Sequence, residues 1–301
     1  QNRLWRCILP DAILEVAGLW FWYDDEDAPV LRGLDLVVQR GELLALVGAN
    51  GSGKTTLTKH FNGLLRPRRG RVRVNGQDAA SRSVGELARH VGYLFQNPEQ
   101  QIFSPTVREE LAFGPQNLGL SSAEVEAQVD DALDRFRLSD VAGSPPAVLS
   151  YGLRRRVTLA SLAAMDPPVL VLDEPTVGLD ARGLDETFDW LAELHTKGRT
   201  IVLVTHDMSL AAEYADRVVA MHKGQIIASA PPAELFLQHE LLSQTSLAAP
   251  PVLALAQALV PSGLKGDSLT AESFCDEYAA LFKERALSRS GPSTGAQAES
   301  G

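Results

Sequence analysis

The sequence predicts an α/β fold: a P-loop core with a mixed central sheet, an antiparallel β part, an inserted helical subdomain and a small C-terminal helical region. The first observation is a glycine-rich loop, residues 48–56, between an apolar run and residues at helical spacing. The second is a pair of wholly apolar runs, residues 169–172 and 201–204, separated by a helical segment, as expected for buried parallel strands. The third is the Asn-Gly pair at 75–76 after alternating residues, which indicates an antiparallel hairpin.

Length and composition allow one large domain or a domain with an appendage. The chain has 301 residues, and 45% are hydrophobic, which is enough for a sizeable core. Its net charge of -10 gives no general attraction to nucleic acid or anionic lipid, so we expect no nucleic-acid partner. Cys7 and Cys275 are the only cysteines, which excludes a disulfide framework and favours a reducing compartment.

The sequence shows no secretory signal and no apolar run of about eighteen residues that could span a bilayer. The chain does not begin with Met. This start fits a trimmed chain or one part of a longer polypeptide.

The front of the chain predicts strands and one helix. Alternating apolar positions indicate strands at residues 14–23 and 34–38, and a third strand, 41–47, leads into the glycine-rich loop. Leu57, Phe61 and Leu64 recur at helical spacing after the loop, with Gly63 and Pro67 as stop signals.

The middle of the chain changes from strand to helical patterns. We expect a strand at 90–95 and then amphipathic helices, one of which starts with a capping box at Ser121 and Glu124. The predicted helices in order are 106–113, 121–136, 154–165, 184–194, 233–236, 252–259 and 270–287.

These patterns divide the chain into three predicted parts. A first domain covers residues 11–236 and includes the helical subdomain at about 97–160. An accessory region follows at 237–287. The last residues, 288–301, are rich in Ser, Gly, Ala and Pro, which is typical of a disordered tail.

The glycine-rich loop has the spacing of a phosphate-binding loop. Its glycines let successive N–H groups point inward at phosphate oxygens, and the helix that follows adds its positive end. Lys54 supplies a charge near the outer phosphates, and the Thr55 hydroxyl is a Mg²⁺ ligand. The alternative is a glycine-rich turn without a ligand, but the strand–loop–helix order favours the nucleotide. The predicted binding residues are Gly48, Ala49, Asn50, Gly51, Ser52, Gly53, Lys54, Thr55 and Thr56.

Polar side chains follow three of the predicted strands. Asp173 can hold Mg²⁺, and Glu174 can orient or deprotonate an attacking water. His206 can hydrogen-bond the terminal phosphate, and the Gln96 amide can contact both the metal and the water. The alternative for the two carboxylates is a solvated strand end.

Together these motifs resemble those of an ATP-binding-cassette ATPase subunit, over residues 14–236. The resemblance rests on the loop, on the strand ends, on residues 149–152 and on residues 178–180. It implies that Ser150 and Gly152 contact the γ-phosphate of ATP bound by a second subunit, and that Asp180 joins this shared site. It also implies that Tyr23 stacks on adenine, although a core aromatic on a strand is the alternative.

Two positions depart from the family signature. Tyr151 stands where the first glycine is usual, and Leu153 stands where glutamine is usual. Tyr151 resembles the cobalt and energy-coupling-factor branch. Residues 95–103 and 113–115 are similar to the same branch, whose members power uptake of vitamins or transition-metal ions.

The branch implies where the chain acts and with which partners. The expected partners are a second ATPase subunit of the same or a related chain, a transmembrane coupling protein and a substrate-binding membrane protein. The chain is expected at the cytoplasmic face of the membrane. The groove beside residues 96–114 is expected to receive the coupling protein, and residues 237–287 are expected to help pair the subunits. Two alternatives remain: a soluble family member that acts on ribosomes or DNA, and a nucleotide-binding regulatory module that does not hydrolyse ATP.

Overall fold

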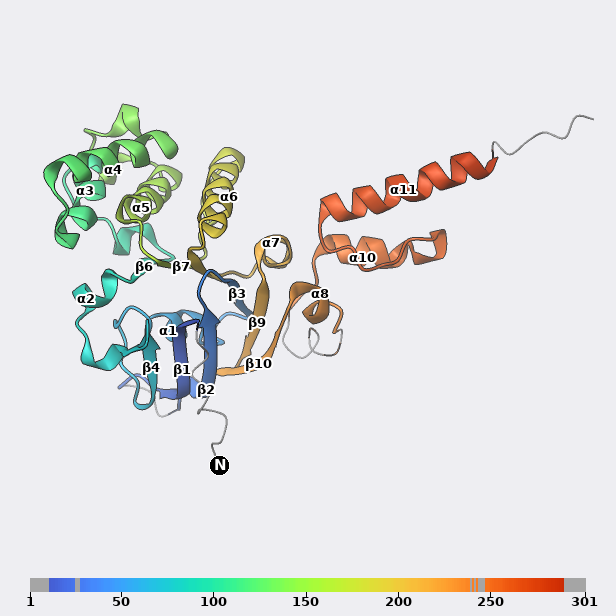
Figure 1. Cartoon of the computed structure of the whole chain (residues 1–301), viewed down its shortest axis with the longest axis horizontal. Coiled ribbons are helices and arrows are strands. Elements are labelled where there is room, and N and C mark those ends of the chain that lie inside the picture. Colours follow the sequence, from blue (N-terminus) through green and yellow to red (C-terminus); the bar gives the residue numbers. More distant parts are fainter. Residues whose placement is uncertain (1–10, 25–27, 239, 241, 243–246, 290–301) are drawn as a thin grey trace, which may run out of the picture.

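The computed structural model describes residues 11–24, 28–238, 240, 242 and 247–289. They form two sheets with helices around them, and two helices at the C-terminal end extend away from the rest (Figure 1). In the described part, no helix is long and apolar enough to cross a membrane.

The larger sheet has six strands in the order β10-β9-β3-β8-β7-β6. Every neighbouring pair is parallel except β10 and β9, so the prediction of a mixed central sheet is confirmed. The predictions missed β9 and β10, although an apolar run and a Lys-Gly turn mark them. The strands are β3 (Leu43–Gly48), β6 (Val91–Leu94), β7 (Val169–Asp173), β8 (Thr200–Val204), β9 (Arg217–His222) and β10 (Gln225–Ala230).

The smaller sheet is antiparallel, with the strand order β2-β1-β4-β5. Its hairpin turns at Asn75 and Gly76, whose φ angles of 50° and 73° match the left-handed backbone that an Asn-Gly turn needs. The predicted antiparallel part is therefore confirmed. The strands are β1 (Ala12–Phe21), β2 (Leu31–Gln39), β4 (Arg69–Val74) and β5 (Gln77–Asp78).

Most of the predicted helices are present, and several are longer than predicted. The capping box at Ser121 and Glu124 is confirmed, since each side chain bonds the backbone N–H of the other residue. The helices are α1 (Lys54–Thr58), α2 (Val84–Ala88), α3 (Val107–Leu118), α4 (Ser122–Arg135), α5 (Tyr151–Met165), α6 (Ala181–Thr196), α7 (Met208–Tyr214), α8 (Pro232–Leu235), α10 (Pro251–Ala258) and α11 (Ala271–Arg289). The predicted tail 288–301 starts inside α11, and its residues 290–301 lie outside the described residues.

The helix after the phosphate loop is shorter than predicted. It ends at Thr58. The Lys59 N–H still bonds the Thr55 carbonyl four residues back, but the N–H groups of His60 and Phe61 bond carbonyls only three residues back. Leu57 and Phe61 are still fully buried, but Leu64 is 42% exposed. The prediction that Leu64 shares their apolar face is therefore wrong.

The central sheet is covered on both faces, so its strands alternate between two cores. Val169 and Val171 of β7 face the core shared with the antiparallel sheet and α1. Leu170 and Leu172 face the core shared with α3, α4, α5 and α6. This two-sided burial explains why the strands are continuous apolar runs, and it leaves their carboxyl ends as the free edge for polar residues.

Candidate functional site

The glycine-rich loop lies between β3 and α1, at the carboxyl end of the central strand. A Cβ atom at Gly48 would come within 2.4 Å of the Met221 carbonyl oxygen on β9. Gly53 has a φ angle of 103°, and a Cβ there would lie 2.7 Å from the Leu31 side chain. Only glycine fits these two positions, so they fix the path of the loop around its inward N–H groups.

Lys54 lies inside the curve of the loop. Its Nζ donates to the carbonyl oxygens of Gly48 at 2.7 Å and of Ala49 at 3.2 Å, and the side chain is buried. Burial lowers the pKa of the ammonium, while the nearby carboxylates of Glu174 and Asp173 act in the opposite direction. The Ser52 hydroxyl is also buried and has no hydrogen-bond partner among the described residues. A buried cation beside an unpaired hydroxyl fits a phosphate group.

Asp173 connects the end of β7 to the loop. Its Oδ2 accepts a hydrogen bond from the Thr55 hydroxyl at 2.7 Å and a longer one, 3.5 Å, from Tyr93. Burial raises the pKa of this carboxyl, and the Thr55 hydrogen bond and the Lys54 charge oppose the shift. A hydroxyl and a carboxylate side by side are hard oxygen donors, so this pair fits Mg²⁺.

Glu174 and His206 meet at the ends of β7 and β8. Glu174 Oε1 lies 2.8 Å from His206 Nδ1, and the Glu174 carboxylate is buried while the His206 side chain is 67% exposed. The Glu174 φ angle of 50° is rare for a residue other than glycine, and such strain costs about 1–3 kcal/mol. Its Oε2 is buried and unpaired within the described residues. One oxygen is therefore held, and the other is free for a ligand such as water.

Tyr23 and Gln96 lie at the rim of this arrangement. The Tyr23 hydroxyl is 3.3 Å from the Thr56 hydroxyl, and its ring is 37% exposed and packs edge-on against Phe21. Gln96 follows β6 by two residues and is exposed, with its backbone anchored through a 3.4 Å hydrogen bond to Arg155. An exposed ring beside the loop is suited to stacking on a flat ligand.

The signature residues gather at the start of α5. Ser150 caps this helix by accepting a hydrogen bond from the Leu153 N–H at 3.3 Å. A Cβ at Gly152 would lie 2.8 Å from the Gly178 carbonyl oxygen, and a Cβ at Gly178 would clash with the Tyr151 ring. The Tyr151 ring therefore packs against Gly178, in the loop between β7 and α6, where a larger residue would not fit.

Asp180 closes the same group. It caps α6 by accepting from the Gly183 N–H at 2.8 Å, and it also accepts from Arg156 at 2.9 Å. These bonds lower the pKa of Asp180. Among the described residues, Asp180 and Ser150 form hydrogen bonds with residues of α5 and α6, and neither bonds the phosphate loop. The site residues thus form two groups, one around Lys54 and one around Ser150.

The sequence reasoning missed Arg155 and Tyr93, which lie behind the site. Tyr93 is buried, and its hydroxyl lies 2.9 Å from the Thr58 hydroxyl, which joins α1 to Asp173. Its burial also raises its pKa well above the ordinary value. Tyr93 occupies a strand pattern, and Arg155 occupies a helix rich in arginine, so neither pattern carried a signal for buried polar contacts.

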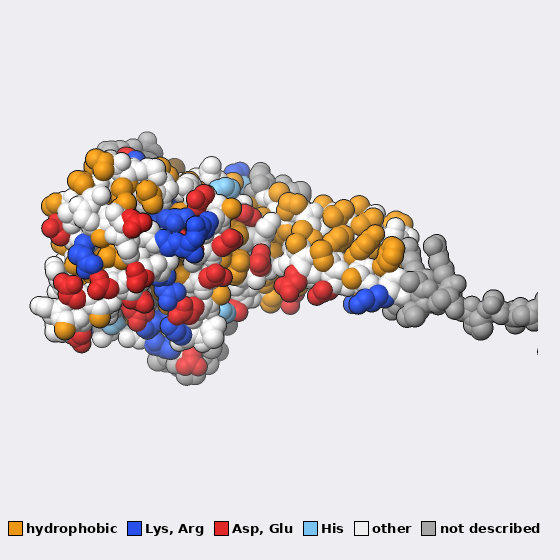
Figure 2. All heavy atoms as spheres, turned by 90° about the horizontal axis from the view of Figure 1, so that it is seen from above, with side chains coloured by type: hydrophobic (Ala, Val, Ile, Leu, Met, Phe, Trp, Pro, Cys, Tyr) orange, Lys and Arg blue, Asp and Glu red, His pale blue; other side chains and the backbone are white. Residues whose placement is uncertain are grey.

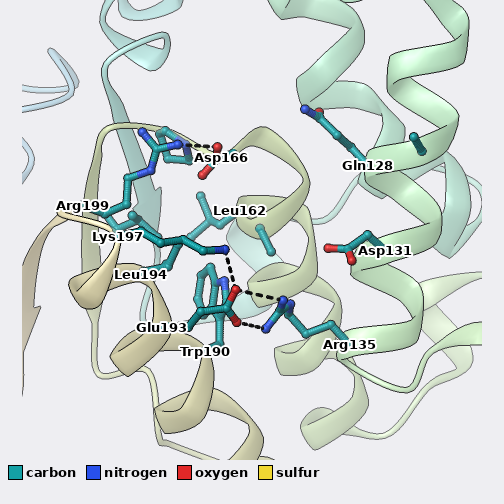
Figure 3. A pocket seen from close by; sticks show the side chains of 14 residues that line it. Gln128, Asp131, Arg135, Leu162, Asp166, Trp190, Glu193, Leu194, Lys197 and Arg199 are labelled. Carbon is teal, nitrogen blue, oxygen red and sulfur yellow. Dashed lines mark hydrogen bonds and ion pairs between the residues drawn. The ribbon is translucent and has the colours of Figure 1, made fainter.

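A separate hollow of about 540 Å³ lies between α4, α5 and α6 (Figure 3), and no residue of the phosphate loop lines it. All the charged side chains that line it, except Asp131, form ion pairs within the described residues. Glu193 bonds Arg135 at 2.6 Å and Lys197 at 2.5 Å, and Arg199 pairs with Asp166. The hollow is therefore a seam between helices in which all the lining charges but one are paired.

Comparisons with known proteins agree with this geometry. Residues 31–177 match the family described as ABC transporter. The chain is 43% identical over 249 residues to the energy-coupling factor transporter ATP-binding protein EcfA of Methanocaldococcus jannaschii, covering 82% of this chain and 89% of that protein. It is 41% identical over 259 residues to the EcfA protein of Methanoculleus marisnigri, covering 84% and 94%. The structure of cbiO1 from Clostridium perfringens, described as part of the ABC transporter complex cbiONQ, has a TM-score of 0.67 at 35% identity and covers 81% of this chain and 98% of that one.

Proposed function

The chain belongs to the ABC transporter family, and from that premise we propose that it is the ATP-hydrolysing subunit of a membrane importer of the energy-coupling-factor type. The observation that carries the proposal is the pair Asp173 and Glu174, buried at a strand end beside the phosphate loop. The names of the relatives support the energy-coupling-factor branch. The two alternatives, a ribosome- or DNA-acting protein and a non-hydrolysing module, find no such support.

The first group of residues binds the phosphates. The inward N–H groups of residues 48–56 cradle the phosphate oxygens, and Lys54 exchanges its bonds to the loop carbonyls for bonds to the outer phosphates. Tyr23 stacks on the adenine. Thr55 and Asp173 would hold Mg²⁺, with Gln96 reaching it from β6. When bound, the metal neutralises charge that develops on the transferred phosphoryl group.

The carboxylate of Glu174 acts on the water. His206 holds Oε1, so Oε2 remains to accept a proton from a water aligned with the γ-phosphorus. The exposed His206, in its imidazolium form, can also donate its Nε2–H to a phosphate oxygen. Gln96 orients the same water from the neighbouring strand end.

The second group of residues completes the site of another subunit. Ser150, Gly152 and the N-terminal end of α5 present N–H groups to a γ-phosphate held by the partner, and Asp180 lies at the same edge. One chain therefore carries two half-sites, and two chains pair head to tail around two ATP molecules. The partner is the same or a related chain.

The membrane partner docks beside the helical subdomain, residues 97–160. Phe103 is 64% exposed and Phe113 is 47% exposed, and their rings pack edge-on with centroids 4.5 Å apart. An exposed aromatic pair in the segment that follows Gln96 suits a short helix of a transmembrane coupling protein. We infer that this complex also contains a substrate-binding membrane protein for a vitamin or a transition-metal ion, and that the chain lies at the cytoplasmic face of the membrane.

The test is purification of the full chain from native membranes together with assay of ATP hydrolysis. We expect a membrane-embedded protein to co-purify with the wild-type chain and to be lost with Phe103→Asp, which places a charge in the aromatic pair. Ile227→Asp is the matched control, because Ile227 is also exposed, at 40%, but lies on β10. Co-purification of ribosomes in place of a membrane protein would overturn the proposal.

The C-terminal region, residues 237–287, helps to pair the subunits. Phe274, Tyr278 and Phe282 form a row along α11 with ring centroids 6.2 and 6.3 Å apart. Tyr278 is 46% exposed and Phe282 is 66% exposed, and hydrophobic side chains gather over this end of the molecule (Figure 2). Such a row on an exposed helix is suited to contact with a second subunit.

Replacing both Tyr278 and Phe282 by Glu is expected to weaken ATP-dependent pairing at least about tenfold. Burial of one large apolar side chain contributes about 1.5–3 kcal/mol, and tenfold in affinity corresponds to about 1.4 kcal/mol. Sedimentation with ATP measures the pairing. Lys283→Glu is the control, since it changes the charge of the same helix without loss of apolar surface. Unchanged sedimentation of the double variant would remove this role from α11.

A further inference from the structure

Arg155 is a fully buried arginine on α5, directly behind the strand ends that carry the hydrolytic side chains. Its guanidinium group reaches two neighbouring strand ends at once. Toward β6, Nη1 donates to the carbonyl oxygen of Phe95 at 2.5 Å and to that of Gln96 at 3.4 Å. Toward β7, Nη2 donates to the carbonyl oxygens of Asp173, at 3.0 Å, and Glu174.

The fifth hydrogen bond completes the set. Nε donates to the carbonyl oxygen of Pro175 at 3.2 Å, so each guanidinium nitrogen donates to a backbone carbonyl. Within the described part of the chain, no carboxylate forms a salt bridge with Arg155. Burial lowers its pKa to about 10, which leaves the group charged at neutral pH.

A buried charge without a carboxylate partner is costly unless its hydrogen bonds are satisfied. Here the satisfying groups are the backbone carbonyls of Gln96, Asp173 and Glu174, whose side chains carry the proposed hydrolysis. The Glu174 backbone is in the left-handed region, and such a conformation persists only where the surroundings hold it. Arg155 and the hydrogen bond from the Glu174 N–H to the Val204 carbonyl at 2.9 Å are those surroundings.

We propose that Arg155 is a positioning residue for ATP hydrolysis, which sets the distance between Gln96 on one strand end and Asp173 and Glu174 on the next. The inference rests on the proposed function, because it concerns the geometry of that same site. The rigid planar fork of arginine reaches both strand ends in fixed directions. A lysine ammonium has three donors on a flexible stem and cannot reproduce this fork.

The position of Arg155 also connects the two groups of site residues. It lies five positions after Ser150, the residue that caps α5. The guanidinium group of Arg155 therefore joins the start of α5 to the ends of β6 and β7. A shift of α5 relative to the central sheet therefore has to move this contact, and with it Gln96 and Glu174.

The test compares Arg155→Lys and Arg155→Gln with Arg217→Lys in the full chain, in its membrane complex. Arg217 is the matched control, because its side chain is 26% exposed and bonds Glu42, which precedes β3, and the Val37 carbonyl on β2, away from β6 and β7. Three quantities are measured: kcat, the ATP concentration at half-saturation, and amide hydrogen exchange in residues 95–97 and 173–174. The melting temperature reports on folding.

We expect both Arg155 variants to lower kcat about a hundredfold, the scale of a misplacement of about 1 Å, while half-saturation changes less than about threefold. Exchange in the two segments should accelerate in these variants and not in Arg217→Lys. A kcat within twofold of wild type would overturn the proposal, and so would a lower kcat with unchanged exchange. If both variants fail to fold while Arg217→Lys folds, Arg155 is a stability residue and the proposal is wrong. A wild-type complex without hydrolysis would instead contradict the proposed function.

Discussion

Glu174→Gln is expected to lower kcat for ATP hydrolysis by about 10²–10⁴-fold, the range that general acid–base catalysis contributes. Gln has the same shape as Glu, and its carbonyl oxygen can still lie 2.8 Å from His206 Nδ1. The amide nevertheless cannot accept a proton from water, so the group that replaces Oε2 can no longer act as the general base. ATP binding should survive, because the contacts of the loop and Lys54 are unchanged.

Single-turnover hydrolysis measures the loss of turnover, and sedimentation with ATP measures the pairing of the ATP-bound subunits. The variant should accumulate as a closed pair with ATP, since hydrolysis is the step that reopens the pair. Glu193→Gln is the matched control, because Glu193 lies on α6 and bonds only Arg135 and Lys197 among the described residues. Normal turnover by Glu174→Gln would show that another group activates the water.

Lys54→Ala is expected to weaken ATP binding by about tenfold to a hundredfold and to stop productive turnover. A hydrogen bond to a charged group contributes about 1.5–3 kcal/mol, and about 1.4 kcal/mol corresponds to tenfold in affinity. Lys54 is already buried next to the loop carbonyls, so little reorganisation is needed when it turns to a phosphate. Alanine leaves the loop without that charge.

Calorimetry with ATP and Mg²⁺ measures this loss of affinity, and Lys197→Ala is the control because its side chain is 62% exposed on α6.

Thermal melting of the nucleotide-free chain at different pH values adds a second test of Lys54. The pKa of Lys54 is lowered in the folded state, so the folded chain releases this proton more readily than the unfolded chain. The stability of wild type relative to Lys54→Ala should therefore rise with pH in the window that ends near 10.5. Equal ATP affinity of variant and wild type would contradict the assigned role.

The candidate site was predicted to different extents in its two groups. The phosphate loop, Asp173, Glu174 and His206 follow apolar strands at defined spacing, and the structure brings these residues together. Contacts of 2.7 Å between Thr55 and Asp173 and 2.8 Å between Glu174 and His206 join stretches of chain far apart in sequence. For Ser150 and Asp180, the described contacts stay local, and their roles rest on a second subunit and remain proposals.

The sequence by itself determined most of the strands and helices of the core, the loop and the residues at the strand ends. The physical reason is that glycine spacing, apolar runs and capping residues act locally, over a few positions. It did not determine the parallel pairing of β9 with β3 or the burial of Arg155. These depend on contacts between distant segments: Met221 beside Gly48, and one guanidinium group between the ends of β6 and β7. Only the tertiary structure decides them, because a local pattern carries no information about which carbonyl a buried side chain will meet.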